Sequence, residues 1–235
     1  GLGCITPIGN DLASFWDSII KGKHGIGPIT KFDASDMKVK IAAEVKNFDP
    51  LLYIDKNEIR KTDLFAQYAI AAATLAVEES GIVHNIAPER LGVYIGSGIG
   101  GISTLIAETE KMLAKGPSRV SPFFVPMMIA NIAAALVAIK YQAMGPNLPV
   151  VTACATSTHA IGEAFRAIKY GYADAIIAGG AEASINSLDI GGFTNCMALS
   201  TTNDPDNSSV PFDKRRDGFV MGEGAGVIVL EEYEH

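Results

Sequence analysis

Short apolar runs and longer amphipathic segments alternate along this 235-residue chain. An apolar run of four to eight residues bounded by turn residues is typical of a buried strand, and apolar residues three and four apart are typical of a helix. The first residues read as the end of a strand that runs into a turn, and further strands are predicted over residues 39–48, 90–96, 149–153, 174–180 and 222–232. Helices are predicted over residues 11–22, 62–81, 102–115, 127–143 and 157–171.

Two of the predicted helices have recognisable ends and faces. The helix over 62–81 has Thr62 as a plausible N-cap and Gly81 as its stop. The residues on its apolar face are Leu64, Tyr68, Ala71, Ala72 and Leu75. The helix after Cys154 has Ser157 available as a cap and ends at Gly171. Its apolar residues at i, i+3, i+4 and i+7 are Ile161, Ala164, Phe165 and Ile168.

Strands that are apolar along their whole length, alternating with helices, favour an α/β layered fold with a largely buried mixed sheet. The chain is long enough for one large domain with a substantial core, and it shows neither a linker nor an internal repeat. A hydrophobic content of 48% and a charged content of only 19% argue against disorder.

Charge and cysteine content exclude several classes of protein. The net charge of −7 provides no overall positive field for nucleic acid. The longest apolar run, residues 129–139, is shorter than a membrane span and contains Asn131. Three cysteines without metal-ligand spacing, in a chain without a secretory signal, indicate reduced thiols and a cytoplasmic protein.

Cys154 lies where the apolar run 149–153 meets the start of a helix. One interpretation is a small apolar residue in a packed core, because free cysteine is among the most frequently buried residue types. The other is a nucleophile, because N–H groups and the helix dipole at such a junction favour the thiolate and could hold an oxyanion.

The sequence offers this cysteine no obvious base. His159 is five residues further on, which turns a helix by about 140°, so the two side chains do not converge. We expect His159 to be a hydrogen-bonded structural residue, and His24, His84 and His235 to have no catalytic role.

The segment GSGIGG at 96–101 follows a strand and satisfies the G-x-G-x-x-G pattern of dinucleotide-binding loops. The acid that should follow about 20 residues later is absent, since no Asp or Glu occurs between Lys111 and Gly162. We therefore expect a tight turn here rather than a nucleotide site.

Several long motifs occur in a fixed order along the chain. They are GLGCITPIGN at 1–10, GSGIGG at 96–101, SPFFVPMMIAN at 121–131, TACATSTHAIGEA at 152–164, AGGAEA at 178–183, GGF at 191–193 and PFDKRRDGFVMGEGAG at 211–226. Together they resemble the β-ketoacyl-[acyl carrier protein] synthase II family of condensing enzymes, and the resemblance runs essentially from end to end.

The resemblance implies a thiolase-like fold, in which two similar halves stack into five α/β layers, and a homodimer. It implies that Cys154 accepts an acyl chain from acyl carrier protein and that malonyl carrier protein then condenses with it, without a cofactor. In the family, two histidines, a lysine and a phenylalanine gate come from the second half. Residues 1–235 are therefore expected to be an N-terminal domain without that half or the start of the first strand, and to be inactive alone.

The resemblance also assigns candidate binding residues. Ile99 matches a position that shapes the acyl pocket, and Phe193 and Phe124 match residues beside the acyl tunnel and at the partner subunit's pocket. Arg60 and Lys61 match positions that meet the acidic carrier protein. Ordinary core packing for the phenylalanines and a solvated charge pair for Arg60 and Lys61 remain open, and the family's frequent arginine four residues after GGF is here Met197.

Residues 213–217, DKRRD, alternate in sign, which favours an internal ion-pair network under the active site over a nucleic-acid contact. Cys4 and Cys196 are expected to be unreactive fillers. Three functions remain open: a condensing enzyme of type II fatty acid synthesis, a polyketide ketosynthase, and a noncatalytic domain that dimerises or binds carrier protein.

Overall fold

The computed structural model describes residues 1–235, which form two compact units. The sheet unit comprises Gly1–Ile5, Phe48–Ala183 and Gly224–His235. The hairpin unit comprises Thr6–Asn47 and Ser184–Glu223. No helix in either unit is both long and apolar enough to cross a membrane.

The sheet unit is built on four strands in the order β1-β6-β5-β4. They are β1 (Leu2–Ile5), β4 (Leu91–Gly96), β5 (Ala175–Glu182) and β6 (Gly224–Glu231). β4 and β5 are parallel, with Gly96 opposite Gly180, whereas β6 is antiparallel to both β5 and β1. The predicted α/β fold with a largely buried mixed sheet is confirmed.

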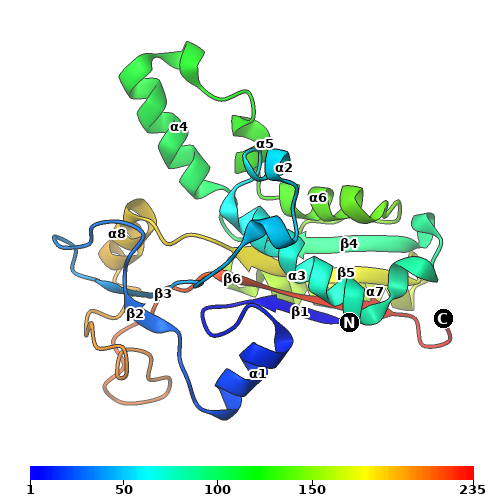
Figure 1. The fold of residues 1–235 in the computed structure, drawn as a ribbon. Coiled ribbons are helices and arrows are strands. Elements are labelled where there is room, and N and C mark those ends of the chain that lie inside the picture. Colours follow the sequence, from blue (N-terminus) through cyan, green and yellow to red (C-terminus); the bar gives the residue numbers. More distant parts are fainter. The chain divides into compact units, whose positions relative to one another are not determined.

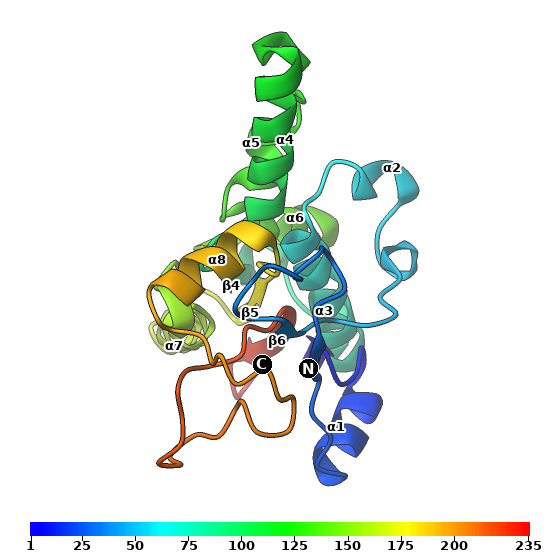
Figure 2. The same cartoon turned by 90° about the vertical axis from the view of Figure 1, so that its left-hand side faces the viewer.

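Helices cover both faces of this sheet (Figures 1 and 2). α3 (Leu64–Ser80) lies on β1, β6 and β5, and α6 (Ile132–Tyr141) lies beside it on β4. α7 (Thr156–Lys169) covers the other face over β5 and β4. α2 (Lys56–Ile59), α4 (Ile102–Lys115) and α5 (Phe124–Met128) complete the unit.

α3 confirms the helix predicted over 62–81, but it is buried almost all round rather than on one face. Its alanines allow close approach: a Cβ on Gly3 of β1 would lie 2.0 Å from the carbonyl oxygen of Ala72. Gly81 ends the helix in the left-handed region, as predicted, with φ of 65°. Asp63, not Thr62, is the N-cap, because its carboxylate accepts the N–H of Phe65 at 3.4 Å.

α7 confirms the helix predicted after Cys154, and of its predicted apolar face Ala164, Ile161 and Ile168 pack on the core whereas Phe165 does not. Its buried residues are Thr156, Ala160, Ala164 and Ala167, and the three alanines share a core cluster with Tyr94, Ile176 and Ala178. Phe165 is 58% exposed, because the small alanines take the positions closest to the sheet. Ser157 does not cap the helix, and Ala155 occupies the N-cap position without a side-chain hydrogen bond.

Three other predicted elements differ from the structure. Residues 149–153 form no strand, and the segment before them meets β4 through an isolated bridge between Asn147 and Val93 and a hydrogen bond from Gly145 N–H to the Leu91 carbonyl. The helix predicted over 127–143 is interrupted between α5 and α6. The carbonyl of Met128 accepts the N–H of Gly101, and the N–H of Ile132 donates to the Ile129 carbonyl instead of to Met128. The strand predicted over 39–48 is only β3 (Ile41–Ala43).

The hairpin unit contains α1 (Leu12–Ile20), β2 (Ile26–Pro28), β3 and α8 (Ser187–Asn195). β2 and β3 pair antiparallel. Its core residues include Val39, Ala42, Ile185, Ile190, Leu199 and Met221. β2 and α8 were not predicted from the sequence, since both are short and glycine-containing.

An ion pair joins the starts of the two parallel strands. The guanidinium of Arg90 donates to both carboxylate oxygens of Asp174, at 3.0 and 2.6 Å, and these hydrogen bonds hold the pKa of Asp174 below its usual value of 3.8. Because the pKa is lowered in the folded protein, the pair stabilises the fold above pH 3.8 and ceases to do so as pH falls through the lowered value. Asp174→Asn should therefore lower the unfolding temperature at neutral pH, and the difference should disappear in acid.

Unfolding curves across the acid range measure this effect. Glu163→Gln is the control, because it removes a more exposed helical pair with Arg166 and should change stability little at any pH. An unfolding-temperature deficit of Asp174→Asn that did not vary with pH would contradict the prediction.

Candidate active site at Cys154

Cys154 is exposed to solvent. It lies in a single 3₁₀ turn, Ala153–Ala155, that leads directly into α7. Within residues 1–235 the thiol is therefore not part of a packed core. Its role as a nucleophile stays a prediction, for which the surrounding backbone supplies the physical setting.

Glycines at the ends of two parallel strands bring the start of α7 to the sheet edge. A Cβ on Gly96 would lie 2.2 Å from the carbonyl oxygen of Val150 and 2.3 Å from Cγ2 of Thr156. A Cβ on Gly180 would lie 2.8 Å from Cβ of Ser157. The cysteine turn therefore sits at the carboxyl ends of β4 and β5, the edge at which open α/β sheets bind ligands.

The turn has a constrained backbone. Ala153 adopts φ of 51°, a left-handed conformation that costs free energy for a residue with a Cβ. Two hydrogen bonds hold it: Thr152 N–H donates to Thr156 Oγ1 at 2.9 Å, and Ala155 N–H donates to the Thr152 carbonyl at 3.1 Å. Because no side chain caps α7, its first turn offers N–H donors and the positive end of its dipole beside the thiol.

His159 is hydrogen-bonded, as predicted. Its Nδ1 lies 2.7 Å from Thr152 Oγ1, so the ring braces the residue that begins the cysteine turn. His24 Nε2 lies 2.8 Å from Asp206 Oδ1, and His235 Nδ1 lies 2.7 Å from Glu231 Oε1.

The GSGIGG loop passes beside the cysteine turn. A Cβ on Gly98 would lie 3.7 Å from Cα of Ala153, and Ile99 is 38% exposed next to it. The N–H groups of Gly98 and Ile99 donate to Glu182 Oε2 at 2.8 and 3.2 Å. An internal carboxylate thus occupies N–H groups of the loop, which supports the interpretation of this segment as a tight turn.

Sequence reasoning missed Glu182. The pairing of β4 with β5 would have indicated it. Glu182 ends β5, which runs parallel to the strand that leads into GSGIGG, so its side chain reaches that loop.

Phe124 and the two basic candidates belong to the same unit. Phe124 is half-buried at the start of α5, whose end packs on the GSGIGG loop through Met127 and Gly101. Arg60 is exposed between α2 and α3. Lys61 pairs with Glu58 at 2.6 Å and lies 5.7 Å from the ring centre of Phe123, so its charge is partly neutralised.

The remaining candidates lie in the hairpin unit. Phe193, in α8, packs edge-on against Phe219 with ring centres 5.8 Å apart. The predicted internal network over 213–217 is wrong, because Arg215 is exposed and pairs locally with Asp213, lowering the pKa of that carboxyl to about 2. The turn that holds these residues lies at the surface.

The two other cysteines differ from each other. Cys4 is buried, in agreement with its expected role as a filler. Cys196 is exposed and so does not fill a core within these residues, whereas its lack of reactivity stays a prediction; its thiol donates to the Phe193 carbonyl at 3.3 Å.

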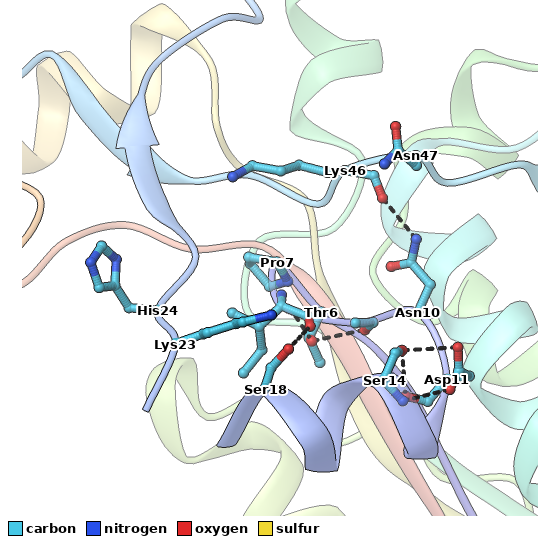
Figure 3. A pocket seen from close by; sticks show the side chains of 12 residues that line it. Thr6, Pro7, Asn10, Asp11, Ser14, Ser18, Lys23, His24, Lys46 and Asn47 are labelled. Atoms are coloured by element: carbon cyan, nitrogen blue, oxygen red, sulfur yellow. Dashed lines mark hydrogen bonds between the residues drawn. The ribbon is translucent and has the colours of Figure 1, made fainter. Parts of the chain in front are cut away.

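A polar hollow of about 450 Å³ lies in the hairpin unit (Figure 3). It is lined by the loop Thr6–Asp11, by Ser14 and Ser18 of α1, and by Lys23, His24, Lys46 and Asn47. None of the predicted site residues lines it. The hollow is therefore separate from the predicted site residues.

Comparison with known proteins identifies what the chain resembles as a whole. The family described as "Beta-ketoacyl synthase, N-terminal domain" matches residues 1–235. The 3-oxoacyl-[acyl-carrier-protein] synthase 2 of Synechocystis sp. is 50% identical and that of Coxiella burnetii 49% identical. Both alignments cover 100% of this chain and 57% of the relative, so the chain spans less than two thirds of their length.

Solved structures agree with this relationship. A β-ketoacyl synthase from Burkholderia phymatum superposes with a TM-score of 0.89 at 30% identity, over 100% of this chain and 58% of that one. A type II polyketide ketosynthase in complex with its acyl-carrier protein gives a TM-score of 0.84 at 29% identity, over 57% of its chain. The layered fold implied by the sequence resemblance is confirmed.

The close approach of α7 to the strand ends is testable without an activity assay. Gly96→Ala places a Cβ against the Val150 backbone, which cannot rotate away, and should destabilise the protein by about 1–3 kcal/mol. Gly162→Ala is the control, because a Cβ there meets nothing within 4 Å and should stabilise α7 by about 0.5–1 kcal/mol. Denaturant unfolding measures both, and equal stability of the two variants would contradict this account.

Proposed function

Because the chain belongs to the β-ketoacyl synthase family, as the N-terminal domain of such enzymes, we propose that it carries the nucleophile of a condensing enzyme of type II fatty acid synthesis. The observation that carries the proposal is the exposed Cys154, held on a strained turn at the uncapped start of α7. Such a thiol has the access and the electrostatic setting that acyl transfer requires.

The proposed reaction has two stages. The Cys154 thiolate attacks the thioester of an acyl carrier protein, N–H groups at the start of α7 stabilise the tetrahedral oxyanion, and the carrier thiolate leaves. Malonyl carrier protein then loses CO₂, and the electron pair of the broken bond forms the new carbon–carbon bond to the acyl carbonyl. The C–S bond to Cys154 breaks and returns the thiolate, so no cofactor is needed.

The groups that promote decarboxylation are, by the resemblance, supplied from outside residues 1–235. No histidine of this chain is proposed for that role, since His159 is engaged with Thr152. The chain contributes the nucleophile, oxyanion donors and substrate-binding residues, which by the resemblance are Ile99, Phe124 and Phe193.

A fatty acid substrate is favoured over a polyketide. Its support is that relatives 48–50% identical over the whole chain are 3-oxoacyl-[acyl-carrier-protein] synthases 2. The exposed cysteine argues against the third alternative, a noncatalytic dimerising or carrier-binding domain.

Acyl carrier protein is the proposed partner, with Arg60 and Lys61 as its docking residues. The exposure of Arg60 supports this, although Lys61 already has Glu58 as a partner. A homodimer and a cytoplasmic location complete the proposal, the latter supported by three free cysteines.

Mass spectrometry tests the nucleophile. Incubation of the complete protein with an acyl carrier thioester should add the acyl group to Cys154, and Cys154→Ala should abolish elongation. Cys196→Ala is the matched control, because that thiol is also exposed yet should be dispensable. Acylation at Cys196, or elongation by Cys154→Ala, would refute the assignment.

Ile99→Phe should shorten the acyl chains that the enzyme accepts. A larger side chain at the pocket excludes methylenes, each of which contributes about 0.8 kcal/mol, or roughly fourfold in kcat/KM. Ile20→Phe, on the exposed face of α1, is the control for an added aromatic ring. Unchanged chain-length selectivity of Ile99→Phe would count against the role of Ile99.

A further inference from the structure

Glu182 connects the two parts of the candidate site. It stands two residues beyond Gly180, the position at which β5 meets Ser157 of α7. Its carboxylate extends to the loop after β4, where Oε1 accepts the hydroxyl of Ser97 at 3.0 Å. The end of β5 therefore contacts both α7 and the GSGIGG loop.

The loop depends on these hydrogen bonds for its shape. Ile99 is flanked by Gly98 and Gly100, and glycine has the greatest backbone freedom of any residue. Glu182 Oε2 accepts the N–H groups of Gly98 and of Ile99 itself, and Ser97 Oγ, bound to Oε1, accepts the N–H of Gly100 at 2.9 Å. A single carboxylate thus fixes the backbone on both sides of Ile99.

The Ile99 side chain lies beside the cysteine turn and is partly open to solvent. It is 38% exposed, although it is apolar, on a loop that passes beside Ala153. Any shift of the loop backbone therefore moves this side chain relative to the neighbouring cysteine turn.

We propose that Glu182 is a positioning residue that fixes Ile99 beside the cysteine turn and so determines which acyl chains reach Cys154. This inference rests on the proposed function. Glu182 touches neither the thiol nor the acyl group in this role; it acts through the Gly98 and Ile99 backbone.

The test uses three substitutions in the complete protein. Glu182→Gln keeps the side-chain length and one acceptor oxygen for the two N–H groups. Glu182→Asp keeps the charge, but its side chain is one methylene shorter. Glu182→Ala removes both acceptor oxygens. Glu44→Ala is the matched control, because Glu44 also accepts two backbone N–H groups and a hydroxyl, from Thr30 and Lys31 in the hairpin unit.

Two readouts are needed. Amide hydrogen exchange of a peptide covering residues 96–101 reports the loop directly, and the ratio of kcat/KM for a long and a short acyl carrier thioester reports selectivity. Loss of two hydrogen bonds should raise loop exchange and change the selectivity ratio by about tenfold in Glu182→Ala and Glu182→Asp, whereas Glu182→Gln should stay close to the unsubstituted protein.

The outcomes separate this inference from the proposed function. Faster loop exchange with altered selectivity only in the Asp and Ala variants supports it. Unaltered exchange in Glu182→Ala, unaltered selectivity despite faster exchange, or an equal effect of Glu44→Ala on selectivity would overturn it. Absence of elongation by the unsubstituted protein would refute the proposed function, while the exchange experiment would still decide whether Glu182 holds the loop.

Discussion

The close contact between the start of α7 and the carboxyl ends of β4 and β5 is the constraint on which the candidate site depends. It requires Gly96 and Gly180, since a Cβ at either position would meet Thr156 or Ser157. With both glycines in place, the preceding turn is held at the sheet edge and Cys154 is exposed there. The left-handed conformation of Ala153 is tolerated because hydrogen bonds around Thr152 hold the turn.

The same use of small residues organises the rest of the sheet unit. α3 and α7 bury alanines where leucine or isoleucine is usual, which brings their backbones close to the strands. Tight backbone packing of this kind forms a rigid interior, because little free volume is left for side chains to rearrange. A rigid support suits a site in which a thiol and its oxyanion donors must keep a fixed geometry.

Much of the sheet unit could be predicted from sequence because its strands are apolar throughout and its long helices have clear ends. The burial of α3 on almost all sides and the exposure of Phe165 in α7 could not, since they depend on which neighbouring elements pack on each helix. The break at Met128 depends on a hydrogen bond from Gly101, which is distant in sequence. In the candidate site, Cys154 could be picked out because it lies where an apolar run meets a helix. The contact of Glu182 with the GSGIGG loop depends on how β4 and β5 are paired. The exposure of Cys196 and Arg215 was not predicted.

The strand order has a consequence for how the protein is made. β6 lies between β1 and β5, and its Ile228 pairs with Leu2, almost the whole described chain away. During synthesis β1 emerges first but has no sheet partner until β6 follows, after both segments of the hairpin unit. Closing so large a loop is entropically costly and slow. Until then, the face of α3 that packs on β1 and β6 is without those strands, so burial of this apolar face has to wait for the strand that is last in the chain.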